Sequence, residues 1–534
     1  MTLRLEFHGA ARTITGSCYV LDTGASRVMF DCGMFQGSKT ESELNYRPFP
    51  FVAEDIDALV LTHAHIDHSG LVPKLVKHGF AGTIHATAAT SDLCSIMLPD
   101  SGYIQETEVR KLNERNRRRG LPEVMPVYTA EDAQRSLSHF SHHGYGEWFE
   151  PAAGLRARFW NAGHLMGSAS IEVEAPAAGS GKPIRILFSG DIGPAFKLLQ
   201  PDPEAPSGLD YVICEATYGA IDRRDNTEST RRDRLAGEVM AARARGGALL
   251  IPSFAVERTQ EIMTDLAILI EAKRLPDLPV FIDSPLAFKA TGIFNKYAVE
   301  LQNGDQLLKA FASPHVRMIE SVDESKALNR LQGFHIVIAA SGMCEAGRIR
   351  HHLKNRLWQP SATVLLAGYQ AQGTLGRLLQ EGVKRVKIHG EEIEVRATID
   401  KIDDYSGHAD GPELHAWMKA RLPVRGGVFL THGEEEGMDG LTRRLVGDVV
   451  ASEHIFRPAL DERFDISGAV PMLLPAEKIH RAPPEAVGHP DWHNDLAQLT
   501  LAIGQVVAKA ANDQARKAVI RKLHRALEQA GAGD

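Results

Sequence analysis

Residues 58–68 read Ala58-Leu59-Val60-Leu61-Thr62-His63-Ala64-His65-Ile66-Asp67-His68, an apolar run that passes directly into three histidines and an aspartate. The apolar half is typical of a buried strand. Imidazole nitrogens and carboxylate oxygens at a strand end are the ligands that first-row metals such as zinc prefer. With 23 histidines in 534 residues, this histidine spacing would arise by chance only about 0.04 times per chain. The stretch therefore predicts a metal site rather than a solvated polar loop.

The composition is that of a globular protein with room for two or three domains. Hydrophobic residues make up 43% of the chain and charged residues 24%, and no long apolar run predicts a membrane span. The chain opens on a strand-like stretch at 3–7 without a signal segment, and its five cysteines form no CxxC pair. We therefore expect a reduced, cytoplasmic protein. The net charge of −8 means that nucleic acid would have to bind at local basic patches.

The pattern of strands and helices changes along the chain. Residues 1–208 alternate short strands with glycine-rich loops, and helices are expected near 87–98 and 100–119. Residues 209–385 alternate strands with helices, which predicts a mainly parallel, doubly wound sheet. Residues 386–460 return to strands that are followed by histidine and aspartate.

The last segment, residues 461–534, has a different character. A proline-rich stretch near 471–491 leads to an expected helix at about 494–530. Its apolar stripe begins at Leu496 and Leu499, and basic residues follow it. Such a stripe must be buried, so we expect it to pack on the body of the chain or in a homodimer. A basic arm for RNA is the alternative.

Three more residues follow strands or tight turns in the first segment. His164 lies among small residues in the stretch 161–168, and Asp191 follows the apolar strand 185–189. Asp31 follows another strand, and a buried aspartate often orients a ligand histidine. Taken singly, such a histidine is more often a core residue and such an aspartate a turn residue. Their order along the chain is what makes them informative.

That order resembles the metallo-β-lactamase fold. The HxHxDH stretch, then Gly163-His164, then Ser189-Gly190-Asp191 are its motifs in sequence. The resemblance covers residues 1–208 and 386–460. It implies an α/β protein whose core is a four-layer αββα sandwich with a two-metal site between the sheets.

Three later stretches are similar to motifs A, B and C of the β-CASP nucleases, which process RNA. They are 214–219, 406–410 and 431–434, with Glu215, His408 and His432 at their centres. The family usually has alanine before the motif B histidine, where this chain has Gly407. The resemblance implies that 209–385 is an inserted doubly wound α/β β-CASP cap domain, and that 461–534 is a C-terminal helical extension.

The resemblance also assigns roles to individual residues. It implies that His63, His65 and His164 bind one metal, that Asp67, His68 and His432 bind the other, and that Asp191 bridges them. Asp67, Asp191, His408 and Glu215 would form the catalytic set, with Asp31 behind the ligands. Two Zn²⁺ per chain are expected, with Mn²⁺ as a substitute, because the ligands are nitrogen and oxygen without thiolate. His408 would serve the leaving oxygen, and Glu215 would orient it.

The cap segment offers candidate phosphate contacts. Ser341 and Gly342 lie in a turn between a strand and a helix, where backbone N–H groups can face an anion. Ser253, Arg258 and Arg348 could add hydrogen bonds to phosphate. Basic clusters at 115–119 and 231–234 could follow an RNA backbone, although solvated surface is the commoner origin of such clusters.

The function that these expectations support is hydrolysis of phosphodiester bonds in single-stranded RNA by a zinc-dependent ribonuclease. Endonuclease action is favoured over 5′→3′ exonuclease action, because the C-terminal segment does not match the exonuclease relatives. A DNA nuclease, a hydrolase of small thioesters or lactams, and a non-catalytic scaffold for RNA processing stay open as alternatives. His432 at motif C favours RNA, since the DNA-repair members typically have an apolar residue there.

Overall fold

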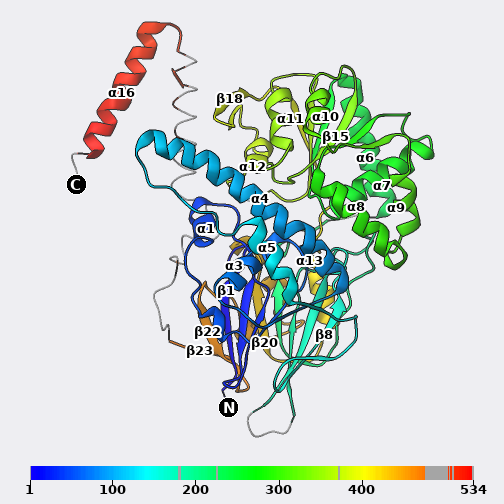
Figure 1. The fold of residues 1–534 in the computed structure, drawn as a ribbon, viewed down its shortest axis with the longest axis vertical. Coiled ribbons are helices and arrows are strands. Elements are labelled where there is room, and N and C mark those ends of the chain that lie inside the picture. Colours follow the sequence, from blue (N-terminus) through cyan, green and yellow to red (C-terminus); the bar gives the residue numbers. More distant parts are fainter. Residues whose placement is uncertain are drawn as a thin grey trace. The chain divides into compact units, whose positions relative to one another are not determined.

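The core of the protein contains two facing β-sheets (Figure 1). The stretch 58–68, which predicts the metal site, begins as a strand of the first sheet. The computed structural model describes residues 2–177, 182–223, 227–370, 373–475, 481, 499, 503, 506, 507 and 510–531. The first sheet has the strand order β23-β22-β1-β2-β3-β4-β5-β6, and the second has the order β21-β20-β11-β10-β9-β8-β7. Each sheet therefore combines strands that end by Glu215 with strands that begin at Val424 or later.

The bounds of these strands follow. The first sheet contains β1 (Arg4–Gly9), β2 (Cys18–Asp22), β3 (Arg27–Phe30), β4 (Ala58–Val60), β5 (Thr83–Ala86), β6 (Phe140–His142), β22 (Glu462–Asp465) and β23 (Met472–Leu473). The second contains β7 (Phe149–Ala152), β8 (Leu155–Asn161), β9 (Ala169–Ala175), β10 (Ile184–Phe188), β11 (Leu209–Glu215), β20 (Val424–Thr431) and β21 (Ile455–Phe456).

Successive side chains along each strand point to opposite faces of the sheet, and this alternation separates the layer between the sheets from the layers under the helices. On β3, Phe30 faces the opposite sheet and stacks on Phe188 with ring centroids 3.9 Å apart, whereas Met29 faces the covering helices. On β20, Phe429 points between the sheets while Leu430 packs under helices on the other side. Successive strand residues point to opposite faces, so both faces of each sheet are buried. The predicted four-layer αββα sandwich is confirmed.

Helices cover the two outer faces. The first sheet is covered by α2 (Ile66–Ser69), α3 (Val72–Lys77), α4 (Ala88–Arg119) and α5 (Ala130–Ser136). The short helix α1 (Lys39–Leu44) packs separately, through Leu44 against Phe35 and Leu460. The second sheet is covered by α13 (Gly411–Lys419) and α14 (Glu435–Leu445). Short 3-10 turns lie at 53–55, 137–139, 298–300 and 452–454.

One long helix replaces two expected ones. The sequence predicts helices near 87–98 and 100–119, but α4 runs without interruption through Pro99. A proline removes one backbone N–H and crowds the preceding turn, so its usual effect is to end or kink a helix. Here the apolar residues Leu93, Met97 and Leu98 pack on the core just before it. Tertiary packing therefore outweighs the local signal.

The cap contains a six-stranded parallel sheet in the order β14-β13-β15-β12-β16-β19, as the βα alternation predicts. Its strands are β12 (Ala248–Pro252), β13 (Val280–Ile282), β14 (Val316–Met318), β15 (His335–Ala339), β16 (Thr363–Ala367) and β19 (Thr398–Ile402). Its helices are α6 (Glu228–Arg245), α7 (Arg258–Glu271), α8 (Pro285–Tyr297), α9 (Gly304–Phe311), α10 (Val322–Leu328), α11 (Ile349–Arg356) and α12 (Leu375–Gln380). The predicted fold class, a sandwich with an inserted α/β cap, is confirmed.

The chain leaves the cap later than the sequence suggests. Residue 386 was the expected return to the core, but β19 pairs with β16 of the cap sheet. The preceding strands β17 (Arg385–Ile388) and β18 (Glu391–Glu394) form a hairpin of their own. Local sequence identifies a strand but not its partner, because parallel pairing is a long-range contact. Sheet pairing thus places residues up to Ile402 with the cap.

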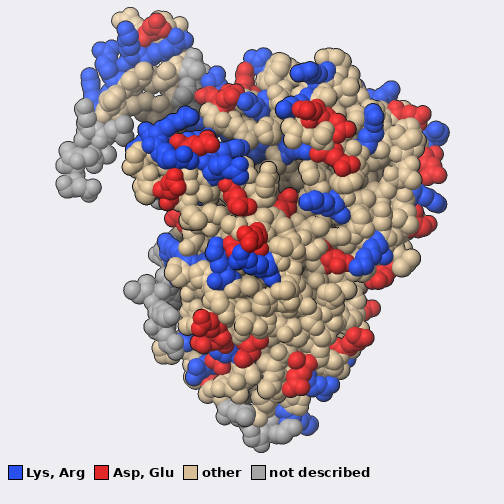
Figure 2. Space-filling model, viewed as in Figure 1, with Lys and Arg blue, Asp and Glu red and all other residues tan. Residues whose placement is uncertain are grey.

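Charged side chains are spread over the visible face, with a basic group over the C-terminal end of α4, at the left of the view (Figure 2). Arg115, Arg117, Arg118 and Arg119 are exposed there. The second basic cluster differs, because Arg231 and Arg232 both pair with the buried Asp265, at 2.8 and 2.7 Å. That cluster is mainly structural. Among the described residues, no helix is both long and apolar enough to cross a membrane.

The C-terminal residues 489–534 form a second unit. Within it, α16 spans Asp513–Gly531. The expected helix of about 494–530 therefore has its second half in α16, whereas Leu496 and most of the first half lie outside the described residues.

Ending the chain at residue 488 tests the role of this second unit. All predicted metal ligands precede residue 433, so we expect metal content to stay unchanged. Burial of the apolar stripe predicts a change in molecular mass in solution or in melting temperature, measured by light scattering and calorimetry. Unchanged mass and melting with weakened RNA binding would instead favour the basic-arm interpretation.

Candidate metal centre

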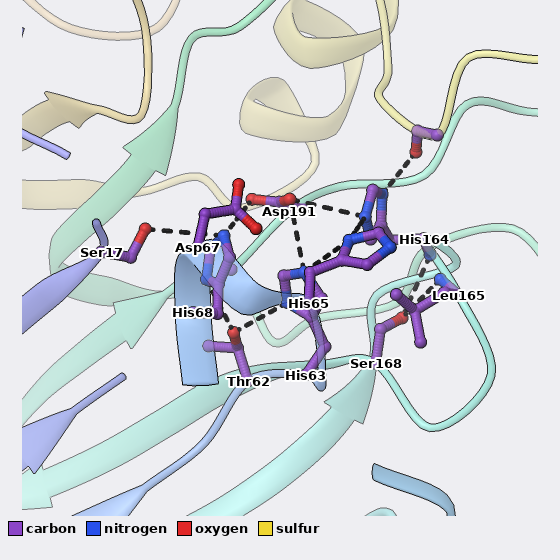
Figure 3. Close-up of polar contacts among 12 residues, drawn as sticks. Ser17, Thr62, His63, His65, Asp67, His68, His164, Leu165, Ser168 and Asp191 are labelled. Carbon is purple, nitrogen blue, oxygen red and sulfur yellow. Dashed lines mark hydrogen bonds and ion pairs between the residues drawn. The ribbon is translucent and has the colours of Figure 1, made fainter. Parts of the chain in front are cut away.

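The HxHxDH stretch links β4 to α2 and is fixed at both ends. Asp67 and His68 lie in the single turn of α2, and their carbonyls accept from Ser17 N at 2.8 Å and Cys32 N at 2.7 Å. His63 and His65 precede that turn. Figure 3 shows these four side chains directed toward Asp191. The strand end and the short helix together place alternate residues on one small surface.

His164 joins the group from the loop between β8 and β9. Gly163 and Gly167 have φ of +66° and +82°, which glycine adopts without strain. His164 Nδ1 donates to the carbonyl of Gly407 at 2.6 Å. That donor fixes the tautomer and leaves Nε2 free as a ligand, 3.4 Å from Asp191 Oδ2.

Asp191 lies between two groups of histidines. Its Oδ2 is 3.5 Å from His63 Nε2, and its Oδ1 is 3.2 Å from His68 Nε2 and 3.5 Å from His432 Nε2. It is 1% exposed. Each carboxylate oxygen therefore faces a different group, which is the geometry that a bridging ligand needs.

The second group contains Asp67, His68 and His432. His432 follows β20 and its Nε2 is 3.6 Å from Asp67 Oδ2. Its Nδ1 contacts the hydroxyl of Thr217 at 2.9 Å. His68 Nδ1 lies 2.7 Å from Asp31 Oδ2, as expected for an aspartate that orients a ligand.

The donor set fits divalent cations. His63, His65, His164 and Asp191 have one ligand atom each within 4.8 Å of the others, and so do Asp67, His68 and His432. Two of these atoms, Asp191 Oδ1 and His432 Nε2, are buried without a hydrogen-bond partner among the described residues, and His65 turns its Nδ1 toward His63 and His164. Buried polar atoms normally have partners, so the Asp191 and His432 atoms point to an ion that they would hold.

The electrostatics of the first ligand group agree with that use, whereas in the second group Asp191 outweighs burial and raises the pKa of His68 and His432. Burial lowers the pKa of His63 and His164 well below the ordinary value, and lowers the pKa of His65 to about 4. These imidazoles are therefore neutral near pH 7, which is the form that binds metal. Burial opposes ionisation of Asp191, but His432 and His68 outweigh it and hold the pKa of this carboxyl well below its usual range.

His408 and Glu215 meet at the rim of the cluster. His408 Nδ1 lies 3.2 Å from Glu215 Oε2 and 3.8 Å from Asp191 Oδ2, and its side chain is 17% exposed. Glu215 ends β11, is buried, and accepts from Ile192 N at 2.6 Å. Arg223 donates to the carbonyl of His408. This histidine is therefore fixed in orientation and reachable from solvent.

Gly407 has a reason to lack a side chain. A Cβ at this position would lie 2.7 Å from Cε1 of His164. The departure from the family's usual alanine therefore permits the close contact between Gly407 O and the His164 ring. Motif comparison flags this position but cannot show that contact.

The candidate phosphate residues differ in their surroundings. Arg258 is 8% exposed, donates through Nε to Tyr405 O at 3.0 Å, and has its NH1 without a partner among the described residues. Its guanidinium lies over Phe254, 4.7 Å from the ring centroid. Ser253 is also buried. A buried guanidinium with an unused donor is suited to an anion.

The turn residues and Arg348 are engaged within the cap. Ser341 Oγ accepts from Glu345 N at 3.1 Å, and Gly342 packs against Phe254, which a Cβ would approach to 3.1 Å. Arg348 donates to Asp283 at 2.6 Å and to the carbonyl of Glu320 at 2.7 Å. These contacts hold the cap together, so phosphate binding by Arg348 stays a prediction that its present partners do not favour.

Facing sheets with a shared histidine–aspartate cluster at their edge define the class of metallo-β-lactamase-fold hydrolases. Family models match in the same order: the metallo-beta-lactamase superfamily over residues 12–95, the Beta-Casp domain over 259–379, and the Zn-dependent metallo-hydrolase RNA specificity domain over 392–454.

Named relatives give the same result. Ribonuclease TTHA0252 of Thermus thermophilus is 37% identical over 83% of this chain and 96% of its own length. The RNase J-like protein of Methanocaldococcus jannaschii is 30% identical over 80% and 92%, and transcription termination factor FttA of Methanosarcina mazei is 29% identical over 81% and 67%. The chain belongs to the β-CASP family of metallo-β-lactamase-fold RNA-processing nucleases.

Proposed function

We propose that this protein hydrolyses phosphodiester bonds in single-stranded RNA as a two-zinc endonuclease. The observation that carries the proposal is the pair of ligand groups that share Asp191, with His408 on their rim. The names of the relatives TTHA0252 and the RNase J-like protein support RNA as the substrate. His432 at motif C supports the same choice.

The ligand groups define where the metals would sit. One Zn²⁺ would be held by His63, His65 and His164, and the other by Asp67, His68 and His432. Asp191 would contribute to both sites. Mn²⁺ could replace zinc, because the ligands are nitrogen and oxygen. When bound, such a pair supplies an acidified water as nucleophile and offsets negative charge on the phosphoryl oxygens. Asp31 and Thr217 orient two of the histidines from behind.

The remaining residues handle the proton and the phosphate. His408 donates a proton to the leaving oxygen, and Glu215 holds its Nδ1 so that Nε2 faces the substrate. Arg258 would offer NH1, which has no partner among the described residues, to a phosphate of the RNA, with Ser253 as a further phosphate contact. Ser341, Gly342 and Arg348 shape the neighbouring turn. Cytoplasmic location and homodimer formation stay predictions.

Cleavage of matched oligonucleotides tests the substrate. We expect single-stranded RNA to be cut well above single-stranded DNA of the same sequence, with little action on either duplex. Binding should weaken as salt rises, because phosphate contacts release counterions. An Arg258→Lys variant should bind more weakly, since lysine cannot reproduce the planar donor set. Equal rates on RNA and DNA would leave only a metal-dependent phosphodiesterase.

A circular RNA distinguishes the two modes of attack. An endonuclease converts it to a linear product, whereas a 5′→3′ exonuclease needs a free end. If linear RNA is cleaved but circular RNA is not, and mononucleotides are released from the 5′ end, endonuclease action would be contradicted. The assignment of the metal centre would not change.

A further inference from the structure

The turn that enters α7 has an unusual backbone at Glu257. Its φ and ψ are +70° and −67°, and Arg258 N donates to Val256 O at 3.0 Å across it. This is a γ-turn of the strained form, which residues other than glycine rarely adopt. Such strain persists where surrounding contacts hold it in place. The contacts of the Glu257 side chain are therefore informative.

The carboxylate of Glu257 reaches from the cap into the core. It accepts from Met166 N at 3.0 Å and from Gln200 Nε2 at 2.9 Å, and it lies 3.6 Å from Lys197 Nζ. Met166 lies in the loop that carries His164. Lys197 and Gln200 follow Asp191 in the next loop. One cap side chain thus contacts two of the loops that supply ligands, the loop of His164 and the loop of Asp191.

Lys197 completes the connection. Its ammonium donates to the carbonyl oxygen of His164, and its side chain is buried. The cap holds the same loop at two further points, where Gln302 N donates to Leu199 O at 3.1 Å and Asn303 Nδ2 to Leu198 O at 2.7 Å. The backbone of His164 is therefore tied to the cap through Lys197 and Glu257.

We propose that Lys197 and Glu257 are positioning residues through which the docked cap sets the orientation of His164 for metal binding. The proposal rests on the metal site of the proposed function but is independent of whether RNA is the substrate. His164 would then be held at two points, its carbonyl by Lys197 and its Nδ1 by Gly407 O. A contribution to folding stability does not by itself explain why Lys197 and Glu257 are buried together, because the cost of desolvating two buried charges offsets much of their attraction.

Metal affinity of the full chain tests the proposal, with Lys197→Met and Glu257→Gly as the variants. Glycine adopts φ +70° without strain, so the second variant is expected to fold. Zinc affinity is measured by competition with a chelator, and the visible spectrum of the Co²⁺-substituted protein reports ligand geometry. We expect affinity for one of the two metals to fall by about tenfold or more in each variant, with an altered cobalt spectrum. The double variant should be no weaker than the weaker single variant.

A matched control separates positioning from stability. His352→Gln breaks a buried 2.6 Å contact to Asp283 that lies wholly within the cap. It should lower the melting temperature while zinc affinity and the cobalt spectrum stay at wild-type values. Lower melting with unchanged affinity and spectrum in Lys197→Met and Glu257→Gly would overturn the proposal, as would additive losses in the double variant. Absence of metal binding by the wild-type protein would overturn the proposed function as well.

Discussion

Replacing Asp191 with alanine is expected to strip the protein of bound metal and reduce RNA hydrolysis to background. The two oxygens of this carboxylate face different ligand groups, at 3.4 Å from His164 and 3.2 Å from His68. Without it, each group keeps three ligands but loses the shared negative charge that offsets the two cations. Elemental analysis should find close to two metals per wild-type chain and far fewer in the variant.

Chelation provides the complementary experiment. Removing metal from the wild-type protein should abolish hydrolysis, and Zn²⁺ or Mn²⁺ should restore it, whereas neither should restore Asp191→Ala. Asp448→Ala is a suitable control, because that exposed aspartate pairs with the surface residues His415 and Lys419, at 2.8 and 2.9 Å, and lies outside the ligand groups. Full activity of the metal-free wild type would contradict the proposed mechanism.

Much of the architecture can be predicted from sequence because local patterns determine it. Alternation of Val28, Met29 and Phe30 specifies a strand buried on both faces, and the repeated strand–helix pattern after residue 209 specifies a parallel sheet. The pairing of β19 with the cap sheet could not be predicted, since either sheet would bury its apolar residues. The continuation of α4 through Pro99 likewise depends on distant packing.

The candidate site shows the same division. Residue types and order predict the groups that converge on Asp191, and the structure brings all seven predicted ligands together. The groups that orient them are unpredictable, because Gly407 is 243 positions from His164 and Thr217 is 215 from His432. The charge of Arg348 predicts a phosphate contact, but in the structure this side chain pairs with Asp283. Asp283 lies 65 positions earlier, so the local sequence around Arg348 does not indicate the pairing.

His408→Ala is expected to lower turnover on RNA by about 10²–10⁴ while leaving the metals in place. The side chain contacts Glu215 at 3.2 Å and stays 3.8 Å from the nearest oxygen of Asp191. An alternative is that His408 is itself a ligand, since its ring nitrogen lies within 4.8 Å of ligand atoms of Asp191 and His432. Metal content decides between them, because loss of metal from His408→Ala would show that this histidine is a ligand.

A change of leaving group isolates the proton transfer. A nucleotide ester of 4-nitrophenol releases an oxygen that needs no proton, so His408→Ala should retain most of its rate on that ester while it fails on RNA. The descending limb of the pH profile of kcat/KM, which reports the general acid, should also disappear.

Glu215→Gln should produce a smaller loss of the same kind, because it weakens the orientation of His408 but keeps the imidazole. His415→Ala, which removes a partly exposed histidine paired with Asp448 at 2.8 Å, should change none of these quantities. Equal losses on both substrates would instead place His408 in the binding of the phosphate rather than in protonation of the leaving oxygen.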